Sequence, residues 1–156
     1  MGDHTETVDL DYNPAQISYE ELLALFWKGH DPTTNTTNQY MSAIFYHDSE
    51  QKALAEKSME EQQKHMARKI ATKILPATEF FEAENYHQKY LLRQQFKLFD
   101  TLGLEGQSLI RSYAAARLNG FVGKYGTVEQ FEKESKEMGL SQSQITQVKR
   151  VLAASP

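Results

Sequence analysis

The sequence of 156 residues contains no cysteine. Within these residues no disulfide, no thiolate nucleophile and no zinc–thiolate site can form. Long hydrophobic runs are absent too, and no apolar stretch approaches the roughly 20 residues that a membrane-spanning helix needs. The N-terminus is polar and acidic, unlike a signal peptide or a basic transit peptide. These features predict a cytoplasmic protein that acts away from the membrane.

Basic residues are not in excess. The chain has 17 lysines and arginines against 21 aspartates and glutamates, which gives a net charge of −4, and the basic residues are spread along the sequence. This pattern argues against nucleic acid as the main partner. Five histidines are present, but the H-E-x-x-H zinc motif, the calcium loop, the G-x-S-x-G elbow and the glycine-rich phosphate loop are missing. We therefore expect neither a metal site nor a cofactor.

Residues 5–12, Thr-Glu-Thr-Val-Asp-Leu-Asp-Tyr, alternate as a β-strand would. Glu6 has the same parity as Val8, Leu10 and Tyr12, so it projects toward the apolar side. Two interpretations follow. Glu6 lies at the solvated beginning of the strand, or it is buried and becomes a candidate for acid–base chemistry.

The next elements alternate between helix and strand. Ser18 and Glu21 form a capping box that begins a helix. Residues 40–46 predict a second strand, a polar helix follows to about residue 66, and residues 70–75 predict a third strand ended by Pro76. This order predicts an α/β sandwich of about three strands with packed helices. So few strands would leave one edge of the sheet uncovered.

The rest of the chain predicts helices only. Residues 107–118 are expected to form one helix, and capping boxes at residues 127–130 and 141–144 begin two more, the first ending at Gly139. We therefore expect two domains, an α/β domain over residues 1–94 and a helical tail over residues 95–156.

Several motifs resemble, in register, the peptide methionine sulfoxide reductase type A family. They are Gly-Asp-His-Thr-Glu-Thr-Val at 2–8, Asp-Tyr-Asn-Pro at 11–14, Ile-Ser-Tyr-Glu-Glu-Leu-Leu at 17–23, Phe-Trp at 26–27, His-Asp-Pro at 30–32, Gln-Tyr at 39–40, Ser-Ala-Ile at 42–44, and Ala-Glu with Tyr-His-Gln at 83–84 and 86–88. The helical tail is similar to extensions on animal-type members. The resemblance implies an incomplete ferredoxin-like two-layer sandwich followed by the all-helical tail.

The resemblance also implies a chemistry. Family members reduce methionine S-sulfoxide, in proteins or as the free amino acid. A cysteine thiolate in a Gly-Cys-Phe-Trp motif attacks the sulfoxide sulfur, and a buried, protonated glutamate gives a proton to its oxygen. Further cysteines, reduced by thioredoxin, then resolve the sulfenic acid. By this resemblance Glu6 is the general acid, and Tyr40 and His87 bind the substrate.

The departures from the family pattern concern the nucleophile above all. No Gly-Cys-Phe-Trp motif is present, no resolving cysteine occurs in the tail, and Asn85 stands where an aspartate is common. Sulfoxide reduction by this route needs a thiolate that is oxidised and later regenerated, which serine, histidine and carboxylate cannot replace. We therefore expect this cysteine-free chain to be inactive as written.

Three readings remain open at this stage. The sequence could be a truncated part of a reductase that begins at an internal methionine. It could instead be a non-catalytic relative that binds proteins or oxidised methionine. The third is an interaction module that retains the site residues only by inheritance.

Overall fold

The computed structural model describes residues 4–154 and divides the chain into two compact units, Met1–Phe80 and Phe81–Pro156. Gly2 and Asp3 of the first motif lie outside the described residues. The sequence predicted a domain boundary after residue 94, and this boundary stays a prediction. Each unit is described below by itself, and no helix of the described residues is long and apolar enough to cross a membrane.

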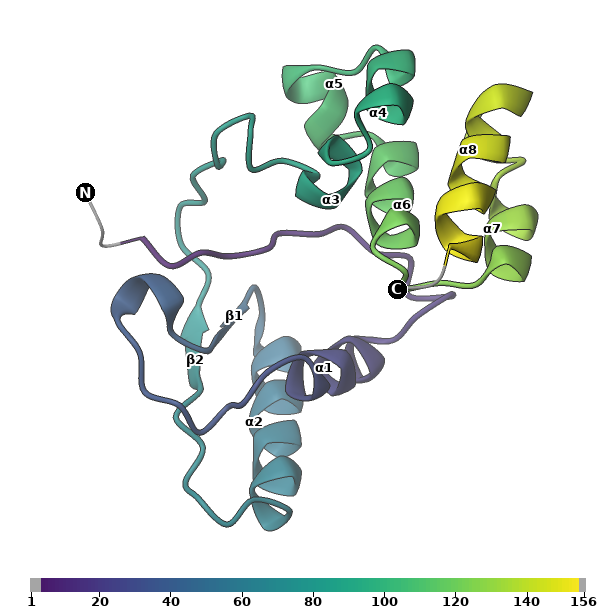
Figure 1. The fold of residues 1–156 in the computed structure, drawn as a ribbon. Coiled ribbons are helices and arrows are strands. Elements are labelled where there is room, and N and C mark those ends of the chain that lie inside the picture. The colour runs from purple at the N-terminus through teal and green to yellow at the C-terminus, as the bar shows by residue number, and fades with distance from the viewer. Residues whose placement is uncertain (1–3, 155–156) are drawn as a thin grey trace. The chain divides into compact units, whose positions relative to one another are not determined.

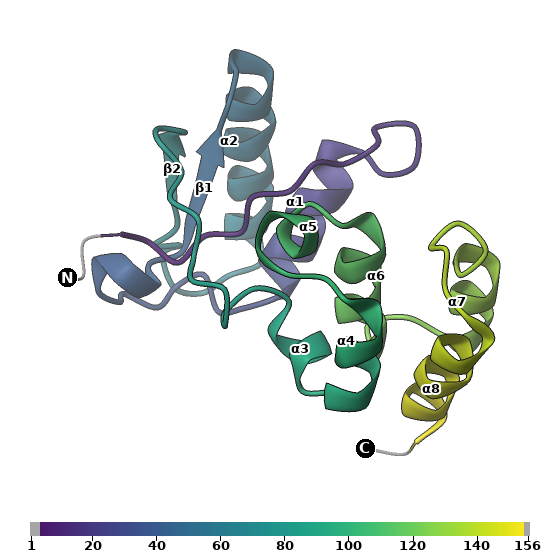
Figure 2. The same ribbon diagram turned by 90° about the horizontal axis from the view of Figure 1, so that it is seen from above.

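The first unit is built on a β–α–β arrangement. Strand β1 (Ala43–Tyr46) pairs in parallel with β2 (Lys73–Pro76), and Ile44 lies opposite Ile74 in the register. Helix α2 (Ser49–Lys64) connects the strands and packs against both, and α1 (Tyr19–Lys28) packs against α2 (Figure 1, Figure 2). This mixed α/β class confirms the predicted fold class.

The core of this unit lies between the helices and the sheet. Its buried residues are Leu23, Trp27, Ile44, Ala55 and Ile70. The Trp27 indole also donates a hydrogen bond of 3.0 Å to the Ser58 hydroxyl on α2. The apolar faces of α1 and α2 are buried against each other, and α1 ends at the Gly29 cap, just before the turn that carries His30 and Asp31.

The predicted strand at residues 5–12 is wrong. These residues have no strand structure, and Val8 is 81% exposed and Leu10 52% exposed. The described residues contain two paired strands rather than three. Alternation assigns side chains to faces, but a strand forms only where a neighbour takes up its backbone hydrogen bonds.

The other two strands begin later than predicted. Residues Asn38–Tyr40 form a short 3-10 helix, η1, so the strand expected at 40–46 is shortened to Ala43–Tyr46 and Tyr40 lies outside it. The strand expected at 70–75 forms at Lys73–Pro76. Both strands are limited to the four residues that pair with each other, from Ala43 opposite Lys73 to Tyr46 opposite Pro76.

The second unit is helical in its described residues, as the sequence predicts for the tail. Its helices are α3 (Tyr90–Arg93), α4 (Phe96–Leu102), α5 (Gly106–Ile110), α6 (Tyr113–Val122), α7 (Val128–Glu134) and α8 (Gln142–Ala153) (Figure 1). The helix expected at 107–118 is two helices, because Ser112 caps α6 by accepting a hydrogen bond from Ala115. The fully buried side chains include Leu92, Leu118, Phe131 and Val148.

Candidate functional site

Two hydrogen bonds join Glu6 to Gln39, which is 33 residues away in the chain. The backbone N–H of Glu6 donates to the Gln39 carbonyl oxygen at 2.9 Å. The Gln39 side-chain amide donates to Glu6 Oε1 at 3.0 Å. Just before them, the Thr5 hydroxyl donates to the Asn38 carbonyl at 3.0 Å. Residues 5–6 therefore lie along residues 38–39, immediately before Tyr40.

Tyr40 is the last residue of η1, and both its backbone N–H and its carbonyl make hydrogen bonds. Its N–H donates to the Thr37 carbonyl at 3.1 Å, and its carbonyl accepts from the Thr36 hydroxyl at 2.6 Å. The residue is nevertheless 60% exposed. A backbone fixed in this way presents the Tyr40 side chain to solvent from a defined position.

The structure corrects the expected burial of Glu6. Its side chain is exposed, as are Val8 and Leu10, which share its parity. Among the described residues no element covers the side of the segment on which Glu6, Val8 and Leu10 lie, so this side is open to solvent. Glu6 therefore meets the Gln39 amide beside open solvent rather than in an apolar pocket.

The remaining predicted site residue, His87, belongs to the second unit. It is exposed, and its Nε2 lies 3.8 Å from Glu84 Oε2. Its backbone N–H donates to the Glu84 carbonyl at 2.9 Å, and its ring centroid lies 4.4 Å from that of Tyr86. The structure thus brings Glu6 to the Gln39–Tyr40 segment and describes His87 only within its own unit.

The turn after α1 holds a carboxylate, Asp31, that accepts three hydrogen bonds. Asp31 Oδ1 accepts hydrogen bonds from the hydroxyl and backbone N–H of Thr33, at 2.7 and 2.9 Å. Asp31 Oδ2 accepts one from Arg68 at 2.7 Å. The Thr33 hydrogen bonds, and then the Arg68 charge, lower the pKa of the Asp31 carboxyl to about 2.

Sequence reasoning gave no role to His30, Ser42 and Thr72, which the structure links in one hydrogen-bond chain. His30 Nε2 lies 2.7 Å from Ser42 Oγ, which lies 2.8 Å from Thr72 Oγ1. The family motifs at 30–32 and 42–44 already contained the first two residues. Their contact became visible only in three dimensions, because it joins the end of α1 to the approach to β1.

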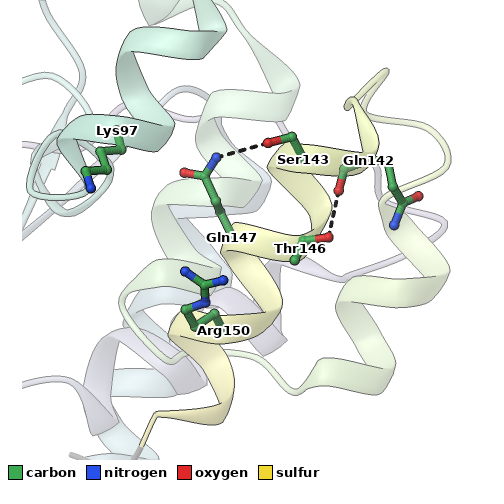
Figure 3. A pocket seen from close by; sticks show the side chains of 6 residues that line it. All are labelled: Lys97, Gln142, Ser143, Thr146, Gln147 and Arg150. Carbon is green, nitrogen blue, oxygen red and sulfur yellow. Dashed lines mark hydrogen bonds between the residues drawn. The ribbon is translucent and has the colours of Figure 1, made fainter.

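The cavities do not coincide with the predicted site residues. One of about 470 Å³ lies in the second unit, where α8 side chains and Lys97 line it (Figure 3). Another, of about 340 Å³, lies beside the His30–Asp31 turn and is lined by His30, Asp31, Thr33, Met66, Ala67 and Arg68. Across residues 4–154, no group of three or more metal-ligating side chains is placed to hold an ion.

Comparisons with known proteins give the class. The family model described as peptide methionine sulfoxide reductase matches residues 1–108, and the helical domain of selenoprotein methionine sulfoxide reductase A matches residues 103–153. The chain therefore belongs to the peptide methionine sulfoxide reductase family.

Two reductases among the relatives agree with this assignment. A peptide methionine sulfoxide reductase of Drosophila melanogaster is 45% identical over 147 residues, which cover 92% of this chain and 60% of the relative. One from Methanococcus maripaludis strain C6 is 50% identical over 97 residues, 58% of this chain and 62% of the relative. The crystal structure of Mxr1 from Saccharomyces cerevisiae in an unusual oxidized form matches with a TM-score of 0.45 at 40% identity, over 53% of this chain and 49% of that one. This chain thus spans about three fifths of the length of the two reductases.

Proposed function

We propose that this chain contributes the oxygen-binding side of a methionine sulfoxide reductase site. The observation that carries the proposal is the two-way contact between Glu6 and Gln39, which places the candidate acid beside the segment that ends in Tyr40. Family membership supplies the substrate class, methionine S-sulfoxide in proteins or as the free amino acid.

Glu6 and Tyr40 have distinct roles in this proposal. The Tyr40 hydroxyl donates a hydrogen bond to the sulfoxide oxygen, and Glu6 delivers the proton that this oxygen needs as its bond to sulfur weakens. The Gln39 amide orients the Glu6 carboxyl by its 3.0 Å hydrogen bond. His87 is a further proposed substrate contact, carried only by its place in the family motif.

The electrons must come from a thiol. A thiolate attacks the sulfoxide sulfur, the protonated oxygen passes to the thiol sulfur as a sulfenic acid, and methionine leaves as the thioether. A second thiol then displaces water from the sulfenic acid to leave a disulfide. Since the 156 residues hold no cysteine, they bind the sulfoxide without reducing it. Turnover needs a thiol from outside these residues, with thioredoxin as the proposed final reductant.

A binding titration tests the oxygen-side proposal. We expect N-acetyl-methionine S-sulfoxide methylamide to shift the amide NMR signals of Glu6, Gln39 and Tyr40 in the ¹⁵N-labelled chain. Tyr40→Phe and Glu6→Ala should each weaken binding about 2- to 10-fold, the usual effect of one lost hydrogen bond.

Two controls make the titration specific. Tyr125→Phe changes a tyrosine in the second unit that is 84% exposed and should leave the affinity unchanged. The corresponding sulfide lacks the oxygen and should bind more weakly than the sulfoxide. If the parent chain shows no shift at Glu6, Gln39 or Tyr40 with the sulfoxide, the proposal is wrong.

A further inference from the structure

We propose that His30 is a positioning residue for the sulfoxide-binding segment 38–42 and that it acts through the Ser42 hydroxyl. The inference rests on the proposed function, since it concerns how Gln39 and Tyr40 are held. It assigns a role to a side chain that lies outside the group formed by Glu6, Gln39 and Tyr40.

Three contacts fix the His30 ring, although the residue is exposed. Nδ1 lies 3.0 Å from the Phe26 carbonyl oxygen in the last turn of α1, and Nε2 lies 2.7 Å from Ser42 Oγ. The ring also meets the Phe26 ring edge to face, with centroids 4.7 Å apart and an interplanar angle of 65°. Two polar contacts and one aromatic contact leave the imidazole a single orientation.

The directions of these hydrogen bonds follow from the atoms involved. The Phe26 carbonyl can only accept, so Nδ1 carries a hydrogen. In the neutral ring Nε2 therefore accepts from the Ser42 hydroxyl, and Ser42 Oγ accepts in turn from the Thr72 hydroxyl at 2.8 Å. In the imidazolium Nε2 donates to Ser42, whose hydroxyl then turns toward Thr72. Both protonation states keep the chain of contacts intact.

The Thr72 end of this hydrogen-bond chain is anchored in the first unit. Thr72 is 7% exposed, and it lies next to Lys73, the first residue of β2. The backbone N–H of Lys73 donates to the Ser42 carbonyl at 3.0 Å. Ser42 is therefore held at its side chain and its carbonyl, two residues after Tyr40.

The turn that carries His30 is fixed at its other residues. The side chain of Asp31 accepts hydrogen bonds from Thr33 in the same turn and from Arg68, which follows α2 in the chain. Pro32 is fully buried, and its carbonyl accepts from the Ala71 N–H at 2.8 Å. A ring mounted on a fixed turn can hold its partner in place, which is what a precise binding site requires of its supporting residues.

The segment 38–42 is consequently held at two ends. Thr5 and Glu6 bond to residues 38 and 39, and His30 and Thr72 bond to Ser42. Tyr40 lies between these anchors. Loss of the His30 contact leaves Ser42 held only by the Thr72 hydroxyl and the Lys73 N–H, and should let Gln39 and Tyr40 move more freely relative to Glu6.

The test compares His30→Ala and Ser42→Ala with the conservative His30→Gln. Both alanine variants remove the His30–Ser42 contact, and Ser42→Ala also removes the contact with Thr72. A glutamine amide carries an NH₂ group that donates and a carbonyl oxygen that accepts, so it can bond to both Phe26 and Ser42. The matched control is His47→Ala, which removes another exposed histidine of the same unit. Amide hydrogen exchange of the free chain and the affinity for N-acetyl-methionine S-sulfoxide methylamide are both measured.

We expect His30→Ala and Ser42→Ala to speed exchange at Glu6 and Tyr40 and to weaken sulfoxide binding about tenfold, as misplacement of a binding group does. His30→Gln should stay within about twofold of the parent, because it keeps both hydrogen bonds. The urea transition followed by Trp27 fluorescence should change little, which separates positioning from a general loss of stability. His47→Ala should match the parent in every measurement.

Unchanged exchange at Glu6 and Tyr40 in both alanine variants overturns the inference, whether or not the ligand binds. A loss of affinity in His30→Gln as large as in His30→Ala also overturns it. A parent chain that binds no sulfoxide, while the alanine variants exchange faster, contradicts the proposed function and leaves the His30 contact supported.

Discussion

Gln39 shows, at the scale of single residues, what sequence reasoning can and cannot reach. Resemblance to the family selected Glu6 and Tyr40, yet it is the half-buried Gln39, the neighbour of Tyr40, that bonds to Glu6 through both its carbonyl and its side-chain amide. Periodicity could not reveal a contact between residues 33 positions apart. Periodicity left Glu6 either solvated or buried, and the structure has it exposed, because burial depends on the layer that covers a residue rather than on its parity.

Asp31 provides a prediction about pH. Its folded pKa of about 2 lies below its ordinary value of 3.8 because Thr33 and Arg68 stabilise the carboxylate. Its contribution to stability is therefore present above about pH 4 and is lost as the pH falls toward 2. Asp31→Asn should destabilise the first unit at pH 7, and its difference from the parent should shrink between pH 4 and 2.

Urea titrations followed by the fluorescence of Trp27, the single tryptophan, measure this difference at each pH. Asp9→Asn is the control, since it removes an exposed carboxylate from the irregular segment at residues 5–12. A difference between Asp31→Asn and the parent that stays constant from pH 7 to pH 2 would contradict this explanation.

Helix α1 is the element that the sequence predicted best. Ser18 Oγ accepts from the Glu21 N–H at 3.2 Å, and Glu21 Oε2 accepts from the Ser18 N–H at 2.8 Å, which is the expected capping box. Capping boxes are local, so four residues suffice to predict one. The segment at 5–12 and the first residues of the strand expected at 40–46 failed for the opposite reason, because strands depend on partners distant in the chain.

The α1 cap can be tested directly. Ser18→Ala should lower the free energy of unfolding of the first unit by about 1 kcal/mol, since it leaves the Glu21 N–H without its acceptor. Ser18→Asp keeps an acceptor at the cap and should recover most of this loss. The readout is again the urea transition of Trp27, which is buried on the same helix.

Ser49→Ala is the matched control for the cap. Ser49 is the first residue of α2, where Asp48 is the capping residue, so alanine there should change the unfolding free energy little. Equal losses for Ser18→Ala and Ser49→Ala would show that the capping hydrogen bond contributes nothing specific.

At the scale of the whole molecule, residues 4–154 form two hydrophobic cores that share no residue. The core of the first unit draws on residues 19–74 and that of the second on residues 91–152. The composition change along the sequence predicted an α/β part and a helical part, and both exist. The number of strands was not predictable in the same way, because alternation within one segment does not show whether another strand pairs with it.

Phe131 tests the separateness of the cores. It is fully buried and meets Phe121 edge to face at 5.2 Å. Phe131→Ala should cost the second unit about 3–5 kcal/mol and speed amide exchange across residues 91–152. Phe96→Ala, at a residue 69% exposed, should cost less than about 0.5 kcal/mol. Trp27 fluorescence should keep its transition in both variants, and a matching shift there would contradict two separate cores.

The central claim is that these 156 residues carry the acid and oxygen-binding groups of a sulfoxide reductase site without its nucleophile. The most direct measurement is reduction of methionine S-sulfoxide with dithiothreitol, by the chain alone and by the chain joined to a segment that carries the family's Gly-Cys-Phe-Trp motif. We predict no reduction above the protein-free control for the chain alone. The joined protein should reduce the sulfoxide, with a rate that falls about 10²- to 10⁴-fold in Glu6→Gln, as loss of a general acid does. Reduction by the 156 residues alone, or a joined protein indifferent to Glu6→Gln, would contradict the account.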